Sequence, residues 1–525
     1  MSDPAKTSIR PAFTAGRSIA ELATRLAVTS VSAVGGPDAE TITGVTHDSR
    51  AVRPGDLYAA LPGAQAHGAA FAAQAAASGA VAVLTDTAGE PTARATGLPV
   101  LAVGDARRVL GPVASWIYGE PSRWLRCLGV TGTNGKTTTS YLLDAALRAS
   151  GKRTGLIGTI ETRIGDQVVP SVRTTPEASD LQALLATMVE RGVEAVAMEV
   201  SSHALALHRV DGTSFDAVGF TNLSQDHLDF HRDLDDYFAA KARLFTPEFA
   251  PGGVVNDDDE YGRRLLAEPH IPLVSFSAQG NPDADWRATQ VVTERTGSRF
   301  LVHGPGIGDA GLGVATHLAG RFNVANALAA LAMLARAGFD PGQVAAGLDT
   351  LAGVPGRLEA VDAGQPFTVF VDYAHTPQAV VTSLETLRET LRETKTGRLL
   401  VVLGCGGDRD AAKRPLMGAA AARLADVAVF TSDNPRSEDP AKILDSVMAG
   451  ALQVPPGERG EVYVDIDRTA AIGQALRGAA PGDVVVVAGK GHEQGQEIGG
   501  VVHPFDDRVV VRRQLAELGW PEATA

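Results

Sequence analysis

An apolar run that leads into a glycine-rich turn and then a helix-forming segment occupies residues 125–139, which read LRCLGVTGTNGKTTT. Glycines let the backbone N–H groups of such a turn converge on phosphate oxygens, and the start of the following helix adds partial positive charge. Lys136 supplies a full positive charge, and the Thr137 hydroxyl can hold Mg²⁺. The segment predicts a phosphate-binding loop, the alternative being an ordinary glycine-rich turn. Val130 stands where the strict motif has glycine, so the loop is a variant, which argues against a generic motor protein or GTPase.

Short runs rich in Val, Ile and Leu alternate with Ala-rich helical stretches through most of the chain. This alternation is typical of parallel sheets with helices on both faces, so we predict an α/β protein. Turn-forming residues interrupt the pattern at 118–122 (YGEPS) and at 353–356 (GVPG). They predict a small N-terminal α/β domain, a central phosphate-loop domain built on a parallel sheet and a C-terminal Rossmann-like α/β domain, at residues 1–121, 122–356 and 357–525.

The charge balance limits the partners of the chain. Its 525 residues carry a net charge of −14, which argues against general attraction to nucleic acid or anionic lipid. Hydrophobic residues make up 44% and charged residues 21%, as in folded globular proteins. The two cysteines, Cys127 and Cys405, are too few for a disulfide framework, and no apolar run approaches the roughly 18 to 20 residues of a membrane helix. We expect a cytoplasmic monomer that binds neither nucleic acid nor membrane.

A carboxylate and a His-rich segment follow two further predicted strands. Glu199 lies near the end of the apolar run 193–200, and a carboxylate at the carboxyl end of a parallel strand borders the ligand crevice of such a sheet. His227 belongs to the segment 221–231, TNLSQDHLDFH, which packs two His and two Asp into six residues. Oxygen-rich ligands with an occasional imidazole suit Mg²⁺ that also holds phosphate. The alternatives are an ordinary strand-end acid and a solvated polar loop.

Lys241 lies on an apolar face of a predicted helix. In the segment 236–245, DYFAAKARLF, helical spacing places positions 237, 238, 241, 244 and 245 on one side, and four of the five are aromatic or Leu. A bare ammonium is costly in such surroundings. The lysine is therefore expected to extend to solvent, to pair with an acid or to be chemically altered.

Three polar clusters follow apolar runs in the last third of the chain: GCGGDRD at 404–410, DNPR at 433–436 and AGKGHE at 488–493. Each comes after a predicted parallel strand, so all three are expected at one edge of the C-terminal sheet. Arg409 and Arg436 can grip a carboxylate, and a glutamate can hold an ammonium. Together the clusters predict a pocket for the charged head of an amino acid, whereas either arginine alone would be expected in solvent.

The loop sequence GVTGTNGKTTT, Lys241 in its Tyr-x-x-x-Lys-x-x-x-Phe context and the DNPR tetrapeptide resemble the Mur ligase family. Its members are cytoplasmic ATP-dependent enzymes that form amide bonds in bacterial peptidoglycan synthesis. The resemblance runs from about residue 43 to about residue 508. It implies ATP as a substrate and two Mg²⁺ ions, and it implies catalytic roles for Lys136, Glu199, His227 and Lys241.

The same resemblance implies metal and nucleotide contacts. The implied Mg²⁺ ligands are Thr137, Glu199, His227 and Lys241, the lysine as an N6-carboxylysine, a carbamate formed with CO₂. The implied ATP contacts are Gly132, Thr133, Asn134, Gly135, Lys136, Thr137, Thr138, Asn323, Asn326, Arg357 and Asp372. The two asparagines open a predicted helix, and one of them is expected to cap it instead of reading adenine.

The resemblance also implies the other substrates. DNPR marks members that add diaminopimelate, whose distal end carries an ammonium and a carboxylate; lysine, without that carboxylate, would leave the two arginines unpaired. The implied amino-acid contacts are Arg409, Asp433, Asn434, Arg436, Gly489 and Glu493. The implied contacts with UDP-MurNAc-L-Ala-D-Glu are Ser49, Gln65, Ala66, His67, Thr174, Thr175, Ser201 and Arg209. Leu207 stands where some relatives have glutamine, which puts that one contact in doubt.

The reaction that the resemblance implies begins with transfer of the ATP γ-phosphoryl group to the D-Glu γ-carboxylate. A diaminopimelate amine then attacks the resulting acyl phosphate. The meso and LL isomers present the same distal charges, so both stay open. Two other functions also stay open: a ligase resembling folylpolyglutamate synthase, which shares the ATP loop and the metal residues, and a phosphate-loop switch or transport ATPase.

Overall fold

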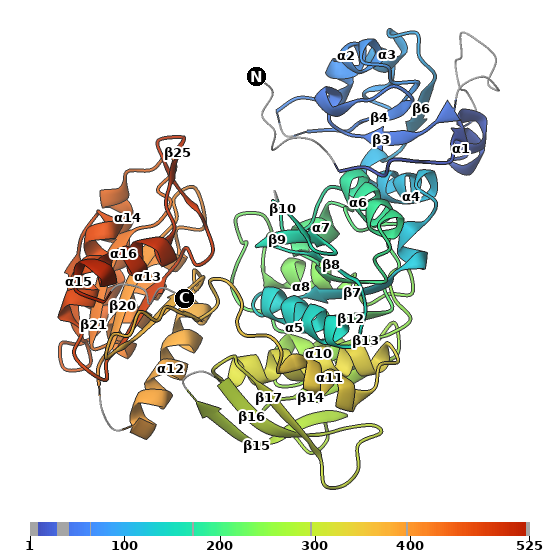
Figure 1. Ribbon diagram of the computed structural model, residues 1–525. Helices are drawn as coiled ribbons and strands as arrows, with labels where there is room; N and C mark the ends of the chain where they lie inside the picture. The colour runs from blue at the N-terminus through green and yellow to red at the C-terminus, as the bar shows by residue number, and fades with distance from the viewer. Residues whose placement is uncertain are drawn as a thin grey trace.

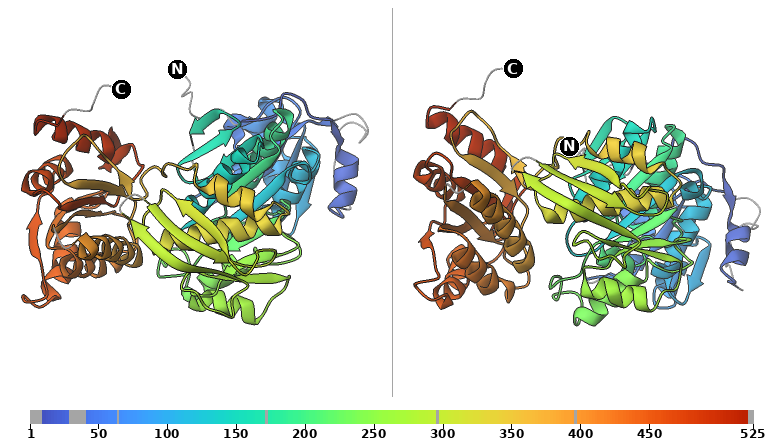
Figure 2. Two further views of the ribbon diagram at one scale, coloured as in Figure 1. Left: turned by 60° about the horizontal axis from the view of Figure 1, so that its bottom comes forward. Right: turned by 90° about the horizontal axis from the view of Figure 1, so that it is seen from below.

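The computed structural model describes residues 9–28, 41–63, 65–170, 173–294, 297–394 and 397–520. These residues fold into three α/β bodies that follow one another along the chain, blue, cyan to yellow, and orange to red in Figure 1. In both further views the C-terminal body lies on one side of the central body and the N-terminal body on the other (Figure 2). The α/β class predicted from the alternation is confirmed.

The N-terminal body is built on four parallel strands in the order β3-β4-β5-β6. The strands are β3 (Gly44–Thr46), β4 (Asp56–Ala60), β5 (Ala82–Asp86) and β6 (Val100–Val103). The helices are α1 (Ile19–Arg25), α2 (Ala72–Ala77), α3 (Glu90–Arg94) and α4 (Ala106–Ile117), and β1 (Arg17–Ser18) pairs with β2 (Thr41–Ile42). Leu57, Leu84 and Leu101 of the sheet pack with Leu110 of α4, so the sheet and this helix share one core.

The central body has an eleven-stranded sheet in the order β10-β9-β8-β11-β7-β12-β13-β14-β15-β16-β17. The strands are β7 (Arg126–Thr131), β8 (Thr154–Ile157), β9 (Glu161–Ile164), β10 (Gln167–Pro170), β11 (Ala195–Glu199), β12 (Ala217–Phe220), β13 (Gly253–Asn256), β14 (Leu273–Ser277), β15 (Trp286–Glu294), β16 (Gly297–His303) and β17 (Leu312–Thr316). Strands β7, β8 and β11 to β15 are parallel, as predicted, and antiparallel strands extend the sheet at both edges, β9 and β10 at one and β16 and β17 at the other. Turns of only a few residues follow β8 and β9, too short for a crossover helix, so these strands must pair antiparallel.

Helices cover both faces of the central sheet. They are α5 (Lys136–Ala149), α6 (Ala178–Glu190), α7 (Ser202–Ala206), α8 (Leu234–Ala242), α9 (Glu260–Ala267), α10 (Arg321–Arg336) and α11 (Pro341–Leu348). One apolar core joins the sheet to α5, α10 and α11, and a second joins its other face to α6, α7 and α8. With both faces covered, the parallel strands can be apolar along their whole length.

The C-terminal body has a six-stranded sheet in the order β18-β19-β23-β20-β21-β22, parallel except at β18. The strands are β18 (Glu359–Ala360), β19 (Thr368–Asp372), β20 (Leu399–Cys405), β21 (Val427–Ser432), β22 (Glu461–Val464) and β23 (Val484–Ala488), with a separate hairpin of β24 (Gly495–Ile498) and β25 (Val501–Pro504). The helices are α12 (Pro377–Thr394), α13 (Lys413–Leu424), α14 (Pro440–Gln453), α15 (Arg468–Gly478) and α16 (Asp507–Glu517). Helices α12 to α14 pack on one face and α15 and α16 on the other.

The three larger sheets fall within the three residue ranges predicted as domains, and the boundaries between these ranges stay a prediction.

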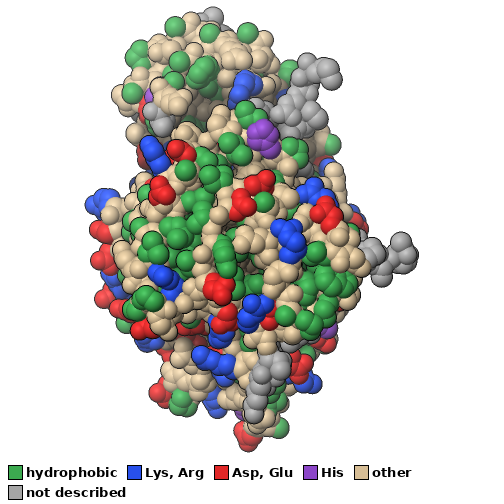
Figure 3. All heavy atoms as spheres, turned by 90° about the vertical axis from the view of Figure 1, so that its left-hand side faces the viewer, with side chains coloured by type: hydrophobic (Ala, Val, Ile, Leu, Met, Phe, Trp, Pro, Cys, Tyr) green, Lys and Arg blue, Asp and Glu red, His purple; other side chains and the backbone are tan. Residues whose placement is uncertain are grey.

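Within the described ranges, no helix combines the length and the apolar character needed to cross a membrane. Figure 3 looks onto the side of the molecule that the C-terminal body occupies. Lys and Arg side chains are interspersed there with Asp and Glu, so this side has no field of a single charge.

A fully buried ion pair ties the two helices on one face of the C-terminal sheet. The Arg468 guanidinium donates to both carboxylate oxygens of Asp507 at 2.7 Å, and both side chains are 0% exposed. Two further donations reach the Ser432 and Ala488 carbonyls, at the ends of β21 and β23. The pair therefore also fixes the edge of the sheet where the DNPR and AGKGHE clusters begin.

Replacing Arg468 by methionine is expected to lower the free energy of unfolding by about 3 to 5 kcal/mol, because it leaves the Asp507 charge buried without a partner. Urea denaturation of the full chain measures this change. The matched control is Arg232→Met, since Arg232 pairs with Asp236 but is 83% exposed; its effect on the free energy of unfolding is expected to be small by comparison. Equal effects of the two replacements would contradict the structural role of the buried pair.

Candidate active site

The predicted phosphate-binding loop joins β7 to α5, and its backbone conformation requires glycine. Gly132 and Gly135 have φ of 149° and 90°, in the region that side chains disfavour. A Cβ at Gly132 would lie 1.9 Å from the Thr221 hydroxyl oxygen, and one at Gly135 would lie 2.4 Å from the Asn326 side-chain oxygen. Gly135 is also the N-cap of α5 and offers no capping side chain. The first N–H groups of α5 are thus available to an external acceptor.

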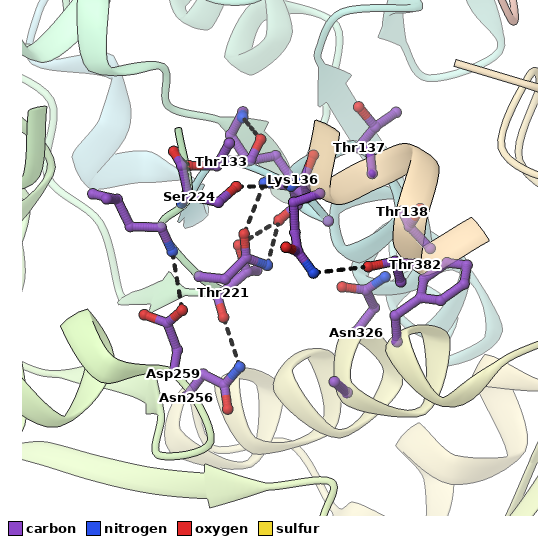
Figure 4. A pocket seen from close by; sticks show the side chains of 18 of the residues that line it. Thr133, Lys136, Thr137, Thr138, Thr221, Ser224, Asn256, Asp259, Asn326 and Thr382 are labelled. Atoms are coloured by element: carbon purple, nitrogen blue, oxygen red, sulfur yellow. Dashed lines mark hydrogen bonds between the residues drawn. The ribbon is translucent and has the colours of Figure 1, made fainter. Parts of the chain in front are cut away.

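The loop opens into a cavity of about 730 Å³ between the central and C-terminal bodies. Figure 4 shows, around one hollow, Thr133, Lys136, Thr137, Thr138, Thr221, Ser224, Asn256, Asp259, Asn326 and Thr382. Thr382 comes from α12 of the C-terminal body, and the other nine come from the central body. Of the predicted nucleotide residues, the cavity lining includes Thr133, Asn134, Gly135, Lys136, Thr137, Thr138, Asn326, Arg357 and Asp372.

Two lysines meet at the loop. Lys136 Nζ donates to the carbonyls of Gly132 and Thr133 at 2.8 and 2.9 Å, and Lys241 Nζ donates to the same Gly132 carbonyl at 2.7 Å. Lys241 is 1% exposed and lies over the Tyr237 ring, 4.5 Å from its centre. Its full burial excludes the expectation that it extends to solvent, and no carboxylate of a described residue lies within ion-pair distance. Burial, together with the charge of Lys136, lowers the pKa of Lys241 well below its ordinary value.

Thr137 and Glu199 form the core of the candidate metal site. The buried Glu199 carboxylate accepts hydrogen bonds from the Thr137 hydroxyl at 3.1 Å and from the Thr159 hydroxyl and N–H at 3.0 and 2.8 Å. Arg357, which follows the GVPG turn, donates to the same Thr137 hydroxyl at 3.0 Å. The segment leading into the C-terminal body thus already reaches the phosphate loop.

His227 lines the same cavity without touching Glu199 in this structure. Its Nε2 lies 3.5 Å from an Asp226 carboxylate oxygen, and its ring meets His203 edge-on at 4.7 Å. Burial lowers the pKa of His227 well below its ordinary value, which keeps the imidazole neutral and able to bind a metal ion. Among the described residues, no three His, Cys, Asp or Glu side chains gather around one point. The predicted Mg²⁺ ligands are thus only partly brought together. The Thr137 hydroxyl and the Glu199 carboxylate beside the phosphate loop nevertheless fit Mg²⁺, because this ion takes further ligands from substrate phosphates.

The helix α10 corrects the expectation for the two asparagines. Its N-cap is Gly320, so neither asparagine caps it, and that prediction was wrong. The Asn323 amide donates to the Ala319 carbonyl at 2.8 Å, and its oxygen accepts from Asn326 at 3.0 Å. With donor and acceptor both engaged and the residue 2% exposed, Asn323 lies behind the cavity wall rather than in it. Asn326 alone of the two lines the cavity.

Asp372 ends β19 on the opposite side of the cavity. Its carboxylate accepts from the N–H groups of Leu358 and Ala374 at 2.7 and 2.9 Å and from the Ser383 hydroxyl at 3.1 Å. Burial raises the pKa of Asp372, these hydrogen bonds opposing the shift. The carboxylate therefore organises the segment that carries Arg357 at the same time as it faces the cavity.

Several polar residues of the cavity were not predicted from the sequence. The segment 221–231, predicted to supply metal ligands, also contributes Thr221, Asn222 and Ser224 to the lining. The residues without a prediction are Asn256, Asp258 and Asp259 after β13 and Tyr373, His375 and Thr382 of the C-terminal body. A signal for one group was present, because Asn-Asp-Asp-Asp at 256–259 follows an apolar run just as Glu199 does. Asn256 donates to the Thr221 carbonyl at 2.7 Å and so joins the ends of two neighbouring strands at the cavity.

The predicted UDP-sugar residues lie in two places. Of this set, Thr174 and Ser201 line the cavity, while the Thr175 hydroxyl donates to the Glu199 carbonyl at 2.9 Å. Arg209 pairs with Glu177 at 2.9 Å. Within the N-terminal body, Gln65 and Ala66 are exposed, the buried Ser49 donates to Gln74 at 3.1 Å, and His67 pairs with Asp86 at 3.0 Å. The predicted contacts with UDP-MurNAc-L-Ala-D-Glu therefore stay predictions. The predicted residues of the N-terminal body lie outside the cavity.

The predicted amino-acid residues gather at one edge of the C-terminal sheet, after β20, β21 and β23, and none lines the cavity. Arg436 donates to the Gly407 carbonyl at 2.6 Å and lies 3.5 Å from a Glu497 carboxylate oxygen. Arg409 is exposed and makes no hydrogen bond or ion pair to a described residue. The expected two-arginine clamp is therefore not closed here, because the loop after β20 leaves Arg409 at the surface while the β24 hairpin anchors Arg436.

Comparison with known proteins identifies the family to which this chain belongs. Three family models match in chain order: Mur ligase family, catalytic domain, at residues 41–118; Mur ligase middle domain at 130–334; and Mur ligase, glutamate ligase domain, at 356–491. Curated proteins of Streptomyces avermitilis and Streptomyces coelicolor, both named UDP-N-acetylmuramoyl-L-alanyl-D-glutamate--2,6-diaminopimelate ligase, are each 58% identical, over 97% and 96% of this chain and 98% of their own lengths. A solved structure of a protein with that name is 32% identical with a TM-score of 0.67, and the match covers 96% of this chain and 100% of that one. The chain belongs to the Mur ligase family.

Proposed function

We propose that this protein joins diaminopimelate to the D-Glu γ-carboxylate of UDP-MurNAc-L-Ala-D-Glu and converts ATP to ADP and phosphate. One observation carries the proposal. A phosphate-loop cavity reached by Arg357 and a charged rim containing DNPR occur in the same chain, which is 58% identical over nearly its whole length to proteins named for this activity. The product would be a peptidoglycan precursor. We also propose that the reaction takes place in the bacterial cytoplasm; the free thiols of Cys127 and Cys405 are compatible with a reducing compartment.

The first step is phosphoryl transfer, in which positioning and charge supply most of the catalysis. The glycine-rich loop and the start of α5 bind the ATP phosphates, and Lys136 neutralises charge on the moving group. Thr137, Glu199 and His227 would hold Mg²⁺, which supplies further neutralisation of the phosphates when bound. The attacking γ-carboxylate is brought to the loop by residues such as Thr174 and Ser201, which border the same cavity.

Lys241 is proposed to carry a carbamate. A neutral lysine nitrogen attacks the carbon of CO₂, a new N–C bond forms, and one proton leaves to solvent. The burial of Lys241 supports this step because it favours the neutral amine. The group thereby changes from a neutral amine to an anionic carbamate, and its oxygens would serve as ligands for a second Mg²⁺.

The second step joins the amino acid. The neutral diaminopimelate amine attacks the acyl-phosphate carbon, and a tetrahedral intermediate forms. The nitrogen gives up one proton to solvent, and phosphate leaves with the electron pair of the C–O bond while the amide remains. An acyl phosphate is open to hydrolysis, so the site must exclude water. Arg357, which contacts Thr137 from the segment leading into the C-terminal body, is suited to close the cavity over the nucleotide.

Phosphate release separates the candidate functions. A ligase releases phosphate only when ATP, UDP-MurNAc-L-Ala-D-Glu and the amino acid are all present, whereas a switch or transport ATPase hydrolyses ATP without an amino acid. Assays with meso-diaminopimelate, LL-diaminopimelate and lysine would identify the amino acid. Folate plus glutamate tests the alternative related to folylpolyglutamate synthase. A rate of phosphate release that is the same with and without diaminopimelate would overturn the proposal.

Replacing Arg436 by alanine is expected to lower kcat/KM for diaminopimelate by about thirtyfold to a hundredfold, because the distal carboxylate loses a charged partner. The KM for ATP is expected to stay unchanged, since Arg436 lies outside the nucleotide cavity. Steady-state phosphate release with each substrate varied in turn measures both quantities. Arg423→Ala, at an exposed position on α13 of the same body, is the control. An unchanged kcat/KM for diaminopimelate in Arg436→Ala would remove the proposed role of DNPR.

A further inference from the structure

Lys490 is a fully buried lysine at the predicted amino-acid rim, and its residue type and spacing predicted no role for it. It follows β23 by two positions and its side chain is 0% exposed. Its Nζ lies 3.0 Å from the Asn434 side-chain oxygen, 3.1 Å from a Glu493 carboxylate oxygen and 3.4 Å from an Asp433 carboxylate oxygen. The lysine therefore joins the DNPR loop after β21 to the AGKGHE loop after β23.

The Glu493 carboxylate is held by only one of its oxygens. Its Oε2 accepts from Asn434 at 2.7 Å and from Lys490 at 3.1 Å. Its Oε1 accepts no hydrogen bond from any residue in the described ranges, and the side chain is 30% exposed. A carboxylate anchored in this way presents its second oxygen in a fixed direction to a donor that arrives from outside.

The cluster of Asp433, Lys490 and Glu493 carries one negative charge more than positive charge. Asp433 and Glu493 contribute two negative charges, and Lys490 contributes one positive charge. The nearby Arg468 is already matched by Asp507, so it does not cancel the remaining negative charge. Without Lys490, the same cluster would hold two carboxylates close to one nitrogen position, with no lysine between them and only the neutral Asn434 amide donating to Glu493. The cluster as built therefore suits one ammonium group of a ligand.

We propose that Lys490 is a specificity-determining positioning residue: it holds Glu493 so that the free carboxylate oxygen receives the distal ammonium of diaminopimelate. This inference rests on the proposed function, because that function supplies the ammonium. Lys490 contacts no substrate itself and acts through Glu493. A ligand with the same chain and distal carboxylate but no distal ammonium would leave this Glu493 oxygen without its partner, and the enzyme would use that ligand less efficiently.

The test compares diaminopimelate with 2-aminopimelate, which has the same carbon chain and the reacting amine but no distal ammonium. In Lys490→Met, which keeps the length of the side chain and removes its charge, kcat/KM for diaminopimelate is expected to fall about ten- to one-hundredfold, mainly through KM. The KM for ATP should stay unchanged. The ratio of kcat/KM for diaminopimelate to kcat/KM for 2-aminopimelate should be smaller in Lys490→Met than in the wild-type enzyme, by a similar factor.

A double-mutant cycle with Glu493→Gln shows whether Lys490 acts through Glu493. When Glu493 is already replaced, adding Lys490→Met is expected to lower kcat/KM for diaminopimelate by less than about twofold, since the two residues form one unit. Two results would overturn the inference and leave Lys490 a packing residue. One is a double variant whose loss in kcat/KM equals the product of the two single losses. The other is an equal loss of activity on diaminopimelate and 2-aminopimelate in Lys490→Met. If Lys490→Met does not fold, Lys490→Gln carries the same comparison.

The outcomes also separate the inference from the function on which it rests. A wild-type enzyme that does not release phosphate with diaminopimelate overturns both. A wild-type enzyme that uses diaminopimelate, together with a Lys490→Met variant of unchanged preference, overturns only the role of Lys490.

Discussion

Lys136→Met is expected to lower the rate of phosphate release by about a thousandfold or more. The ammonium of Lys136 is within 3 Å of the Gly132 and Thr133 carbonyls and therefore lies in the loop whose N–H groups are proposed to bind the ATP phosphates. Methionine retains the length of the side chain and removes the charge that neutralises the moving phosphoryl group. Because that charge acts most strongly where negative charge develops, kcat should fall further than ATP binding weakens.

The measurement is phosphate release at saturating ATP, UDP-MurNAc-L-Ala-D-Glu and diaminopimelate, with nucleotide binding followed separately by calorimetry. Lys442→Met is the matched control, because Lys442 is exposed on α14 and lies outside the cavity. A Lys136→Met enzyme within tenfold of the wild-type rate would show that the loop does not perform the phosphoryl transfer.

Lys241 gives the second large effect, and its dependence on CO₂ distinguishes a carbamate from a simple lysine. Wild-type activity is expected to fall in buffer stripped of CO₂ and to return when bicarbonate is added. Lys241→Met should be slower by roughly a thousandfold under both conditions, because it removes an anionic group proposed to hold a metal ion. Its rate should not respond to bicarbonate, since the variant has no amine to modify.

Carbon-13 NMR provides a readout independent of turnover. With labelled bicarbonate, a carbamate carbon signal is expected from the wild-type protein and not from Lys241→Met. Lys152→Met serves as the control for the other lysines, because Lys152 is a partly exposed residue paired with Glu194. Full activity of the wild-type enzyme without CO₂, together with no labelled carbamate, would rule the modification out.

Local spacing was enough to predict much of this protein. The phosphate loop, the strand that ends in Glu199 and the apolar surroundings of Lys241 each depend on residues that are neighbours in the chain, and all three are present. The helix that carries Lys241 ends at Ala242, before Leu244 and Phe245, which are nevertheless buried. The shared edge of β20, β21 and β23 was also predictable, because parallel strands bring their carboxyl ends together. The α/β class followed from the same alternation.

Side-chain contacts between distant segments were not predictable in this way. Whether Asn323 caps a helix or binds behind the cavity wall depends on how the chain before α10 approaches it. Arg409 and Arg436 carry the same charge in similar clusters, yet only the second is anchored, because the β24 hairpin pairs beside it.

The sequence by itself determined the strand and helix pattern, the nucleotide loop and the family, since these depend on short-range spacing and on residue type. Only the tertiary structure decided that Arg357 touches Thr137, that Lys241 has no acidic partner among the described residues, and that Lys490 donates to Glu493. Such contacts depend on packing between elements far apart in the chain. Burial then sets the energy of each charged group, and burial is a property of the assembled fold.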